Sequence, residues 1–149
     1  MPPVVRFVTV GSLKEPYLRE AVAEYRKRLS GLCRVEELEL KEARLPDRPS
    51  EAEIRAAIPP RSYPVALCVE GERLSSPALT ARLQDACRSA GSLCFIIGSS
   101  FGLDPSVKSA ARLRLSVSDL TFPHQLMRVI LYEAVYRCFQ IDLGTRYHK

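Results

Sequence analysis

An α/β domain with a largely parallel sheet and helices on both of its faces is the fold that this sequence predicts. Apolar, β-branched runs recur along the chain, and most are separated by stretches whose apolar residues have helical spacing. Two runs, 65–69 and 93–97, are apolar at every position, which is typical of central strands covered on both faces. The 149 residues are enough for one core, so we expect residues 1–149 to form a single domain.

The first half of the chain begins the alternation of strand and helix. Residues 4–10 (VVRFVTV) and 35–40 (VEELEL) are predicted to be strands. Between them, the apolar residues of 15–29 recur at intervals of four, three and four, which predicts a helix. Residues 43–60 are rich in proline and charge, and we expect an exposed excursion that holds one short helix near 51–58.

The second half continues this alternation. Residues 65–69, 93–97 and 113–117 complete the set of expected strands. Residues 75–90 begin with Ser-Ser-Pro, and hydroxyl caps followed by a first-turn proline favour the start of a helix. Strands that alternate with helices in this way indicate a parallel sheet.

The last helix is predicted to start at Pro123 and to run to about Gln140. Its apolar residues cover more than one face, which indicates burial on several sides. In a domain of this size, part of that burial is expected from a second subunit. We therefore predict a homodimer with this helix at the interface.

Composition and charge narrow the possible classes of protein. Hydrophobic residues make up 46% and charged residues 26%, the balance of a soluble globular protein. We find no secretory signal and no apolar run long enough to cross a bilayer, so a cytoplasmic location is expected. The five cysteines are scattered and form no CxxC pair, so neither a metal nor a disulfide is expected. The net charge of +5 is compatible with a polyanionic partner.

A glycine-containing loop follows the strand at 93–97. It runs from Gly98 to Leu103, and Asp104 and Pro105 then open a helix. Glycine lets a backbone approach a ligand closely at the carboxyl end of a parallel strand, but a plain turn that needs positive φ angles explains the loop equally well. The spacing fits neither a phosphate-binding loop nor a dinucleotide fingerprint, which favours a cofactor without a polyphosphate.

A second unusual loop spans residues 115–124 and leads from a short strand into the last helix. Its backbone could wrap a ligand, or its hydroxyls could cap the helix. On that helix Glu133 and Arg137 have the spacing of an intrahelical ion pair. Arg128 and Arg137 are nine residues apart and therefore face opposite ways. Within a single subunit they cannot both serve the same site unless the helix crosses between two sites. A dimer would allow this arrangement.

The segment from Phe95 to Lys149 carries the most specific motifs of the chain. LSVSDLTFPHQLMRVILYEAVYRCF and the terminal YHK resemble the ribosomal RNA large subunit methyltransferase H family, which belongs to the SPOUT class of S-adenosylmethionine-dependent enzymes. VTVGSLKEPYLREAVAEYRKRL near the start is similar to the first strand and helix of that family. The resemblance thus spans essentially the whole chain.

This resemblance implies a fold, an activity and a set of site residues. The fold is a SPOUT-type domain with a C-terminal trefoil knot, and the activity is methylation, in a homodimer, of N3 of a pseudouridine in 23S ribosomal RNA of the assembled ribosome. The cofactor, S-adenosyl-L-methionine, would be bound by Leu67, Gly98, Val117, Ser118, Asp119, Leu120, Thr121 and Phe122. Catalysis would involve His148, Arg137, Tyr147 and Arg128, supported by His124 and Glu133.

Two positions depart from the family pattern. Ser99 stands where a second glycine is usual, and serine tolerates positive φ less well. Cys68 stands where an acidic residue is common, and Glu70 is the nearest carboxylate that could replace it. Both changes are expected to affect cofactor affinity more than chemistry.

The residue types allow a mechanism and leave two alternatives open. The N3 proton must leave, so His148 is the candidate base, with Arg137 or Arg128 holding phosphate or developing charge and Tyr147 stacking on a base. We expect the tail of one subunit to close the site of the other. The alternatives are a non-catalytic RNA-binding or ribosome-assembly module and a SPOUT methyltransferase that acts on another RNA.

Overall fold

The computed structural model describes residues 3–41, 51–99 and 102–149. Five strands form one sheet in the order β2-β1-β4-β3-β5, and all four strand pairings are parallel. The strands are β1 (Val4–Val10), β2 (Arg34–Leu40), β3 (Tyr63–Arg73), β4 (Ser92–Ile97) and β5 (Leu113–Ser116). The predicted α/β class with a parallel sheet is confirmed.

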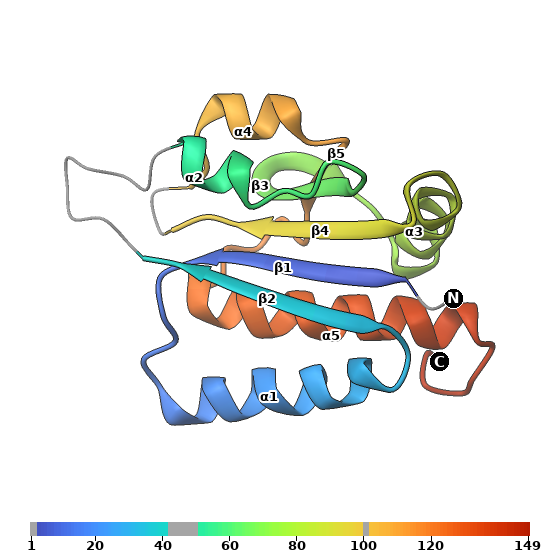
Figure 1. The fold of residues 1–149 in the computed structure, drawn as a ribbon. Helices are drawn as coiled ribbons and strands as arrows, with labels where there is room; N and C mark the ends of the chain where they lie inside the picture. Colours follow the sequence, from blue (N-terminus) through green and yellow to red (C-terminus); the bar gives the residue numbers. More distant parts are fainter. Residues whose placement is uncertain (1–2, 42–50, 100–101) are drawn as a thin grey trace.

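Helices cover both faces of the sheet, as predicted (Figure 1). One face packs against α1 (Pro16–Ser30), α3 (Ser76–Ala90) and α5 (His124–Asp142), and the other packs against α2 (Glu51–Ala56) and α4 (Pro105–Ala110). Alternate residues of each central strand supply the two faces, so that the core has two layers.

The larger core layer lies between the sheet and α5. Phe7 of β1 stacks on Tyr132 of α5, with ring centroids 3.9 Å apart, and on Phe95 of β4, at 5.6 Å. All three aromatic side chains are almost completely buried. Leu131 and Val135 are buried beside them, so α5 is fixed to the middle of the sheet.

The helix boundaries follow local capping. The Ser75 side chain accepts a hydrogen bond from the amide of Ala78 (3.2 Å), and Gly91 ends α3 with φ of 77°. Asp104 caps α4 by accepting from the amide of Ser106 (3.0 Å). The last helix begins at His124, one residue after the predicted start, and ends at Asp142, two residues after the predicted end.

Two predictions about the middle of the chain are only partly confirmed. The short helix expected in the exposed excursion at 43–60 is α2, but Ile54 and Ala57 are buried in the core layer between the sheet and the helices α2 and α4, and residues 42–50 lie outside the described residues. The strand at 65–69 was expected to be covered on both faces, but Val69 is 90% exposed. The chain bulges out of β3 after Leu67, because Leu67 and Glu72 both pair with Leu115 of β5. The trefoil knot stays a prediction of the resemblance.

Candidate active site

A cavity of about 460 Å³ opens where β3, β4 and β5 end. Ligands of parallel α/β sheets bind at this edge, and the volume is in the range of small-molecule sites. All the residues predicted to bind the cofactor line the cavity, namely Leu67, Gly98, Val117, Ser118, Asp119, Leu120, Thr121 and Phe122. The structure therefore brings three loops that are distant in sequence to one place.

Two glycines allow the backbone to approach closely around this cavity. A Cβ atom on Gly98 would lie 2.6 Å from the carbonyl oxygen of Gly102, and one on Gly71 would lie 2.7 Å from the backbone of Arg114. Neither glycine has a positive φ. Close approach, and not turn geometry, is thus the reason that these two positions need glycine.

The serine that departs from the family pattern fits its position. Ser99 forms a bridge with Gly102, whose amide donates to the Ser99 carbonyl oxygen at 2.9 Å. Positive φ angles occur only at glycines among the described residues, and Gly102, with φ of 82°, is one of them. The expected strain at Ser99 is therefore absent, since the left-handed residue of this loop is a glycine.

The loop that leads into α5 folds on its own hydroxyl groups. Ser118 accepts a hydrogen bond from the amide of Leu120 (3.0 Å), and the Ser116 hydroxyl donates to the Ser118 carbonyl oxygen (3.3 Å). Asp119 forms an ion pair with Arg73 at the far end of β3. Helix α5 has no side-chain cap, so these hydroxyls do not serve as caps and Thr121 remains available at the cavity.

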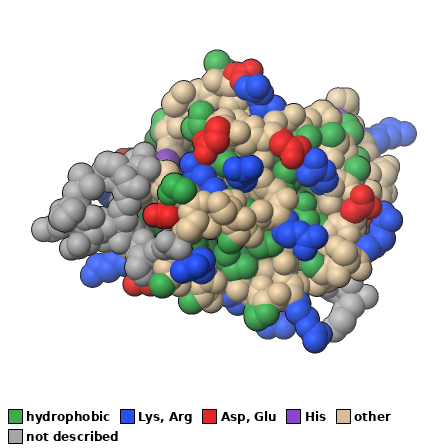
Figure 2. All heavy atoms as spheres, turned by 90° about the horizontal axis from the view of Figure 1, so that it is seen from above, with side chains coloured by type: hydrophobic (Ala, Val, Ile, Leu, Met, Phe, Trp, Pro, Cys, Tyr) green, Lys and Arg blue, Asp and Glu red, His purple; other side chains and the backbone are tan. Residues whose placement is uncertain are grey.

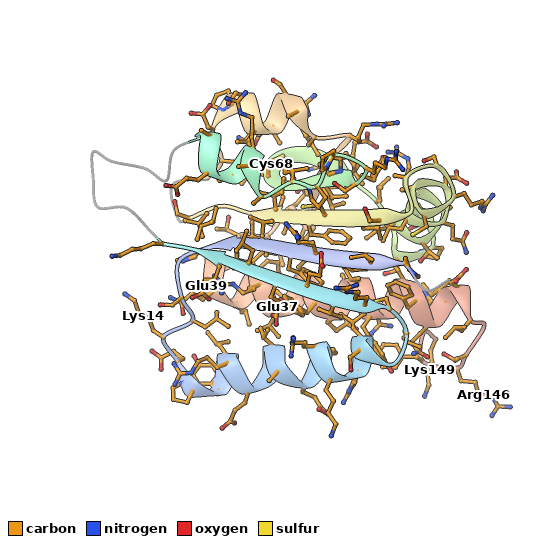
Figure 3. All side chains as sticks on the ribbon, viewed as in Figure 1. Lys14, Glu37, Glu39, Cys68, Arg146 and Lys149 are labelled. Carbon is orange, nitrogen blue, oxygen red and sulfur yellow. The ribbon has the colours of Figure 1, made fainter. Side chains whose placement is uncertain are left out.

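Residues of the β3 bulge complete the rim, among them Cys68 and Glu70, which sequence analysis connected with cofactor affinity, and they meet Lys108, which it did not name. Glu70 pairs with Lys108 of α4, and both line the cavity. This pairing lowers the pKa of Glu70. Cys68, labelled in Figure 3, lines the same cavity, and its burial raises the pKa of the thiol, which is therefore neutral at pH 7. Gly71 in an otherwise polar stretch was the one sign of this bulge in the sequence.

The first residues of α5 close the cavity on another side. His124 and Met127 line it, beside Phe122. His124 is half-buried and lies in the cavity lining. Of the polar residues predicted to support the site, it is the one that lies in this cavity.

The remaining predicted residues gather at the other end of α5. Glu133 accepts hydrogen bonds from Arg137 (2.6 and 3.0 Å) and from the Tyr147 hydroxyl (3.2 Å), while Arg137 Nη1 lies 3.2 Å from His148 Nδ1. The Arg137 guanidinium also lies over the Tyr147 ring, 4.8 Å from its centroid. The tail is thus ordered by α5 of its own chain. Desolvation and Glu133 raise the pKa of Tyr147 to about 12, which keeps its hydroxyl protonated.

These two groups of residues do not meet within one chain. His124 and Arg137 are thirteen residues apart on one helix, which corresponds to about 20 Å of rise. Figure 1 shows α5 running from the edge where the strands end to the opposite edge, where the C-terminus lies. One chain therefore provides a cavity at one end of α5 and a polar tail cluster at the other.

Arg128 lies apart from both groups and is only 5% exposed. Its guanidinium donates to Glu39 of β2 (3.1 Å) and to the carbonyl oxygen of Gly11 after β1 (2.8 Å). Its Nε has no partner among the described residues. Since this cation faces the sheet and contacts neither the cavity nor the tail, the geometry assigns it to positioning α5 and not to direct contact with substrate.

A second cavity, of about 320 Å³, lies between α3 and α5. It is lined by Pro3 before β1, by Leu93 at the start of β4 and by Phe139 near the end of α5. These residues place it at the edge where the strands begin, away from the three loops. No group of three or more His, Cys, Asp or Glu side chains suited to a metal ion occurs among residues 3–41, 51–99 and 102–149. Within the same ranges, no helix is long and apolar enough to cross a membrane.

Comparisons with known proteins agree with this geometry. Residues 4–148 match the family model described as predicted SPOUT methyltransferase. The chain belongs to the SPOUT methyltransferase family. It is 43% identical to a protein of Streptococcus thermophilus named "Ribosomal RNA large subunit methyltransferase H", over 97% of this chain and 99% of that one. A protein of the same name from Leuconostoc mesenteroides is 41% identical with the same coverage. The predicted family is thereby confirmed.

A solved structure supports the fold alone. A probable methylase family protein from Haemophilus influenzae superposes with a TM-score of 0.61 at 8% identity, covering 97% of this chain and 70% of that chain. Such a low identity carries no information about substrate. The superposition shows that the two chains share an overall fold.

Proposed function

We propose that this protein is a cytoplasmic, S-adenosylmethionine-dependent methyltransferase that modifies N3 of a pseudouridine in 23S ribosomal RNA of the assembled ribosome. The observation that carries the proposal is the cavity at the carboxyl ends of three parallel strands, lined by all eight residues that the family resemblance assigns to the cofactor. The names of the relatives support the ribosomal substrate.

The cavity fits an adenosine-containing amino acid cofactor in both its apolar and its polar parts. Leu67, Ile97, Leu103 and Leu115 give it an apolar wall for a purine ring. Glu70 offers carboxylate oxygens for ribose hydroxyls, and Lys108 offers a cation for a carboxylate. When bound, this cofactor supplies an electrophilic methyl group on a positively charged sulfur.

The tail cluster supplies groups for the RNA base. Arginine has no hydrogen-bond acceptor, so a hydrogen bond between Arg137 Nη1 and His148 Nδ1 requires Nδ1 to accept. The hydrogen of a neutral His148 then lies on Nε2. In this state His148 donates a hydrogen bond and stabilises the negative charge that spreads to the base oxygens when N3 loses its proton. To act as the base, His148 must first shift this hydrogen or leave Arg137.

We infer that the active unit is a homodimer in which the tail of one subunit closes the cavity of the other. Each chain holds the two groups of residues about 20 Å apart along α5. The same helix keeps partly exposed apolar residues on one face, among them Leu126, Ile130, Ala134 and Ile141 at intervals of four, four and seven. This stripe runs from the cavity toward the tail, and a two-fold contact along it would bring the tail of each subunit toward the cavity of the other.

Mixed dimers test the shared site. Gly98→Val blocks a cavity, and deletion of residues 147–149 removes a tail, so each variant is expected to be inactive as a homodimer. After the two are unfolded and refolded together, heterodimers contain one intact cavity served by one intact tail. Random assembly then restores about a quarter of wild-type activity. Complementation that fails although heterodimers form would contradict the shared site.

Two measurements test the function itself. Calorimetry with S-adenosylmethionine tests the cofactor, and mass spectrometry of 23S ribosomal RNA from cells that lack the protein should show one pseudouridine without its methyl group. A protein that binds ribosomes but not the cofactor would instead be a non-catalytic assembly module. The strain expected at Ser99 was the only support for that alternative, and Ser99 has no positive φ. Methyl transfer to an RNA outside the ribosome would support the other alternative.

A further inference from the structure

A series of aromatic and cationic side chains joins α1 to the C-terminal tail. The Arg28 guanidinium lies over the rings of Tyr25 (5.2 Å) and Tyr136 (5.8 Å). Tyr136 packs edge-on against Tyr147, with ring centroids 4.9 Å apart. The Arg137 guanidinium also lies over the Tyr147 ring. The last turns of α1 and the catalytic tail therefore form one continuous surface.

Exposed positive charge surrounds this series. Lys27, Arg146 and Lys149 are exposed, and the described residues place no carboxylate within ion-pair distance of any of them. Figure 3 shows Arg146 and Lys149 at the end of the molecule where α1 ends, far from Lys14. The Arg28 side chain is 41% exposed. Its one ion pair among the described residues is with Glu24, at a long N–O distance of 3.6 Å.

The opposite face of the sheet has a different distribution of charge. Figure 2, which looks down on the side of α2 and α4, shows Lys and Arg interspersed with Asp and Glu. One of the cations there, Lys108 of α4, is paired with Glu70. Such a mixed surface has little net attraction for a polyanion.

We propose that the surface formed by Tyr25, Lys27, Arg28, Arg146 and Lys149 binds the ribosomal RNA strand that flanks the target nucleotide. Exposed lysines and arginines bind phosphates, and a guanidinium packed against tyrosine rings, as that of Arg28 is, offers a planar cation on which a base can stack. Because this surface is continuous with Tyr147 and His148, it lies beside the nucleotide whose base the tail contacts. The proposal rests on the proposed function and adds to it the RNA footprint.

The position of this surface beside the tail decides which of the two cavities of the dimer it serves. Within one chain it lies at the edge where the strands begin, and the cavity lies at the other edge. In the dimer it therefore serves the cavity of the partner subunit, together with the tail. The RNA is held by one subunit while the cofactor is held by the other.

A pair of matched arginines tests the proposal. Arg112 lies over the ring of Tyr63 at 5.4 Å, so it is stacked like Arg28 but precedes β5, at the sheet edge opposite β2 and α1. Arg28→Glu and Arg112→Glu change the net charge equally. We expect Arg28→Glu and Lys27→Glu to raise KM for ribosomes by about tenfold, the scale of one lost charge-assisted contact, and Arg112→Glu to change it by less than about twofold.

Three further readouts separate RNA binding from a structural role. Calorimetry with S-adenosylmethionine should give the same affinity for all three variants, because the cavity is unchanged. The slope of log affinity for ribosomes against log salt should fall by about one for each lost contact. Arg28→Lys should keep this slope but weaken binding, since lysine binds phosphate without offering a plane to a base.

Specific outcomes would overturn the proposal. Equal KM values for Arg28→Glu, Lys27→Glu and Arg112→Glu, in enzyme that methylates ribosomes, would show that this surface does not contact RNA. Binding to anionic lipid vesicles that is lost in the same variants, with unchanged ribosome kinetics, would assign the surface to membranes instead. Absence of methyl transfer and of cofactor binding by the wild-type protein would refute the proposed function and not this surface alone.

Discussion

Replacing Gly98 by alanine is the sharpest test of how the cavity is built. An added Cβ would lie 2.6 Å from the Gly102 carbonyl oxygen, 2.8 Å from its carbonyl carbon and 3.0 Å from the Leu103 side chain. Backbone atoms cannot rotate away as a flexible side chain can. The loop must therefore open by about 0.8 Å to reach an ordinary contact distance.

The cost follows from this overlap. Overpacking of a tightly packed site costs about 1–3 kcal/mol, and in a domain of this size each kcal/mol lowers the Tm by about 2–4 °C. The loop that must move is the one against which the cofactor is proposed to lie. The same free energy corresponds to about 5- to 150-fold weaker cofactor binding.

Gly91→Ala is the matched control. Gly91 has φ of 77° and no atom within 4 Å of an added Cβ, so alanine there is strained but meets nothing. It should lower stability by about 1–2 kcal/mol at the end of α3 and leave cofactor affinity unchanged. Thermal unfolding and calorimetry with S-adenosylmethionine measure the two quantities. Wild-type cofactor affinity in a folded Gly98→Ala protein would refute the role assigned to this glycine.

Three further predictions concern two buried side chains of α5 and one cysteine of the cavity. Arg128→Ala should lower the free energy of unfolding, measured by chemical denaturation, by about 2–3 kcal/mol. This loss is smaller than that expected from breaking a fully buried ion pair, because Glu39 is half exposed. An unchanged stability would contradict the positioning role of Arg128. Tyr132→Phe should cost about 1–2 kcal/mol, since its buried hydroxyl donates to Glu37, and a neutral effect would show that this bond is not needed. The pKa of Cys68 is raised by burial and by Glu70, so its thiol should react with iodoacetamide more slowly than free cysteine at about pH 8, and faster as the pH rises and thiolate forms. S-adenosylmethionine should slow the labelling of Cys68 but not that of Cys87, which lines the other cavity. Equal protection of both cysteines would count against the cofactor site.

Much of the candidate site was predictable because its residues lie next to strand ends. Gly98 and residues 117–122 follow or end strands that the apolar pattern identified, Leu67 lies within a third such strand, and parallel strands bring their carboxyl ends to one edge. Glu70 was considered as a replacement for the carboxylate absent at position 68, but Lys108 was missed, because a bulge that no periodicity predicts turns Glu70 toward α4. The stacking of Arg28 on Tyr25 and Tyr136 joins two helices that are far apart in sequence, so only their packing shows it.

Helical and strand periodicity, capping residues and the C-terminal motifs determined the α/β class, nearly all element boundaries and the family. These features are local, and local spacing decides which face of an element is apolar. Tertiary structure alone decided what each charged or glycine residue does. It buries Arg128 against the sheet, frees Ser99 from strain by placing the positive φ at Gly102, and sets the tail about 20 Å from the cavity of its own chain. Such roles depend on which residues of other elements lie within a few ångströms, and the order of residues along the chain does not contain that distance.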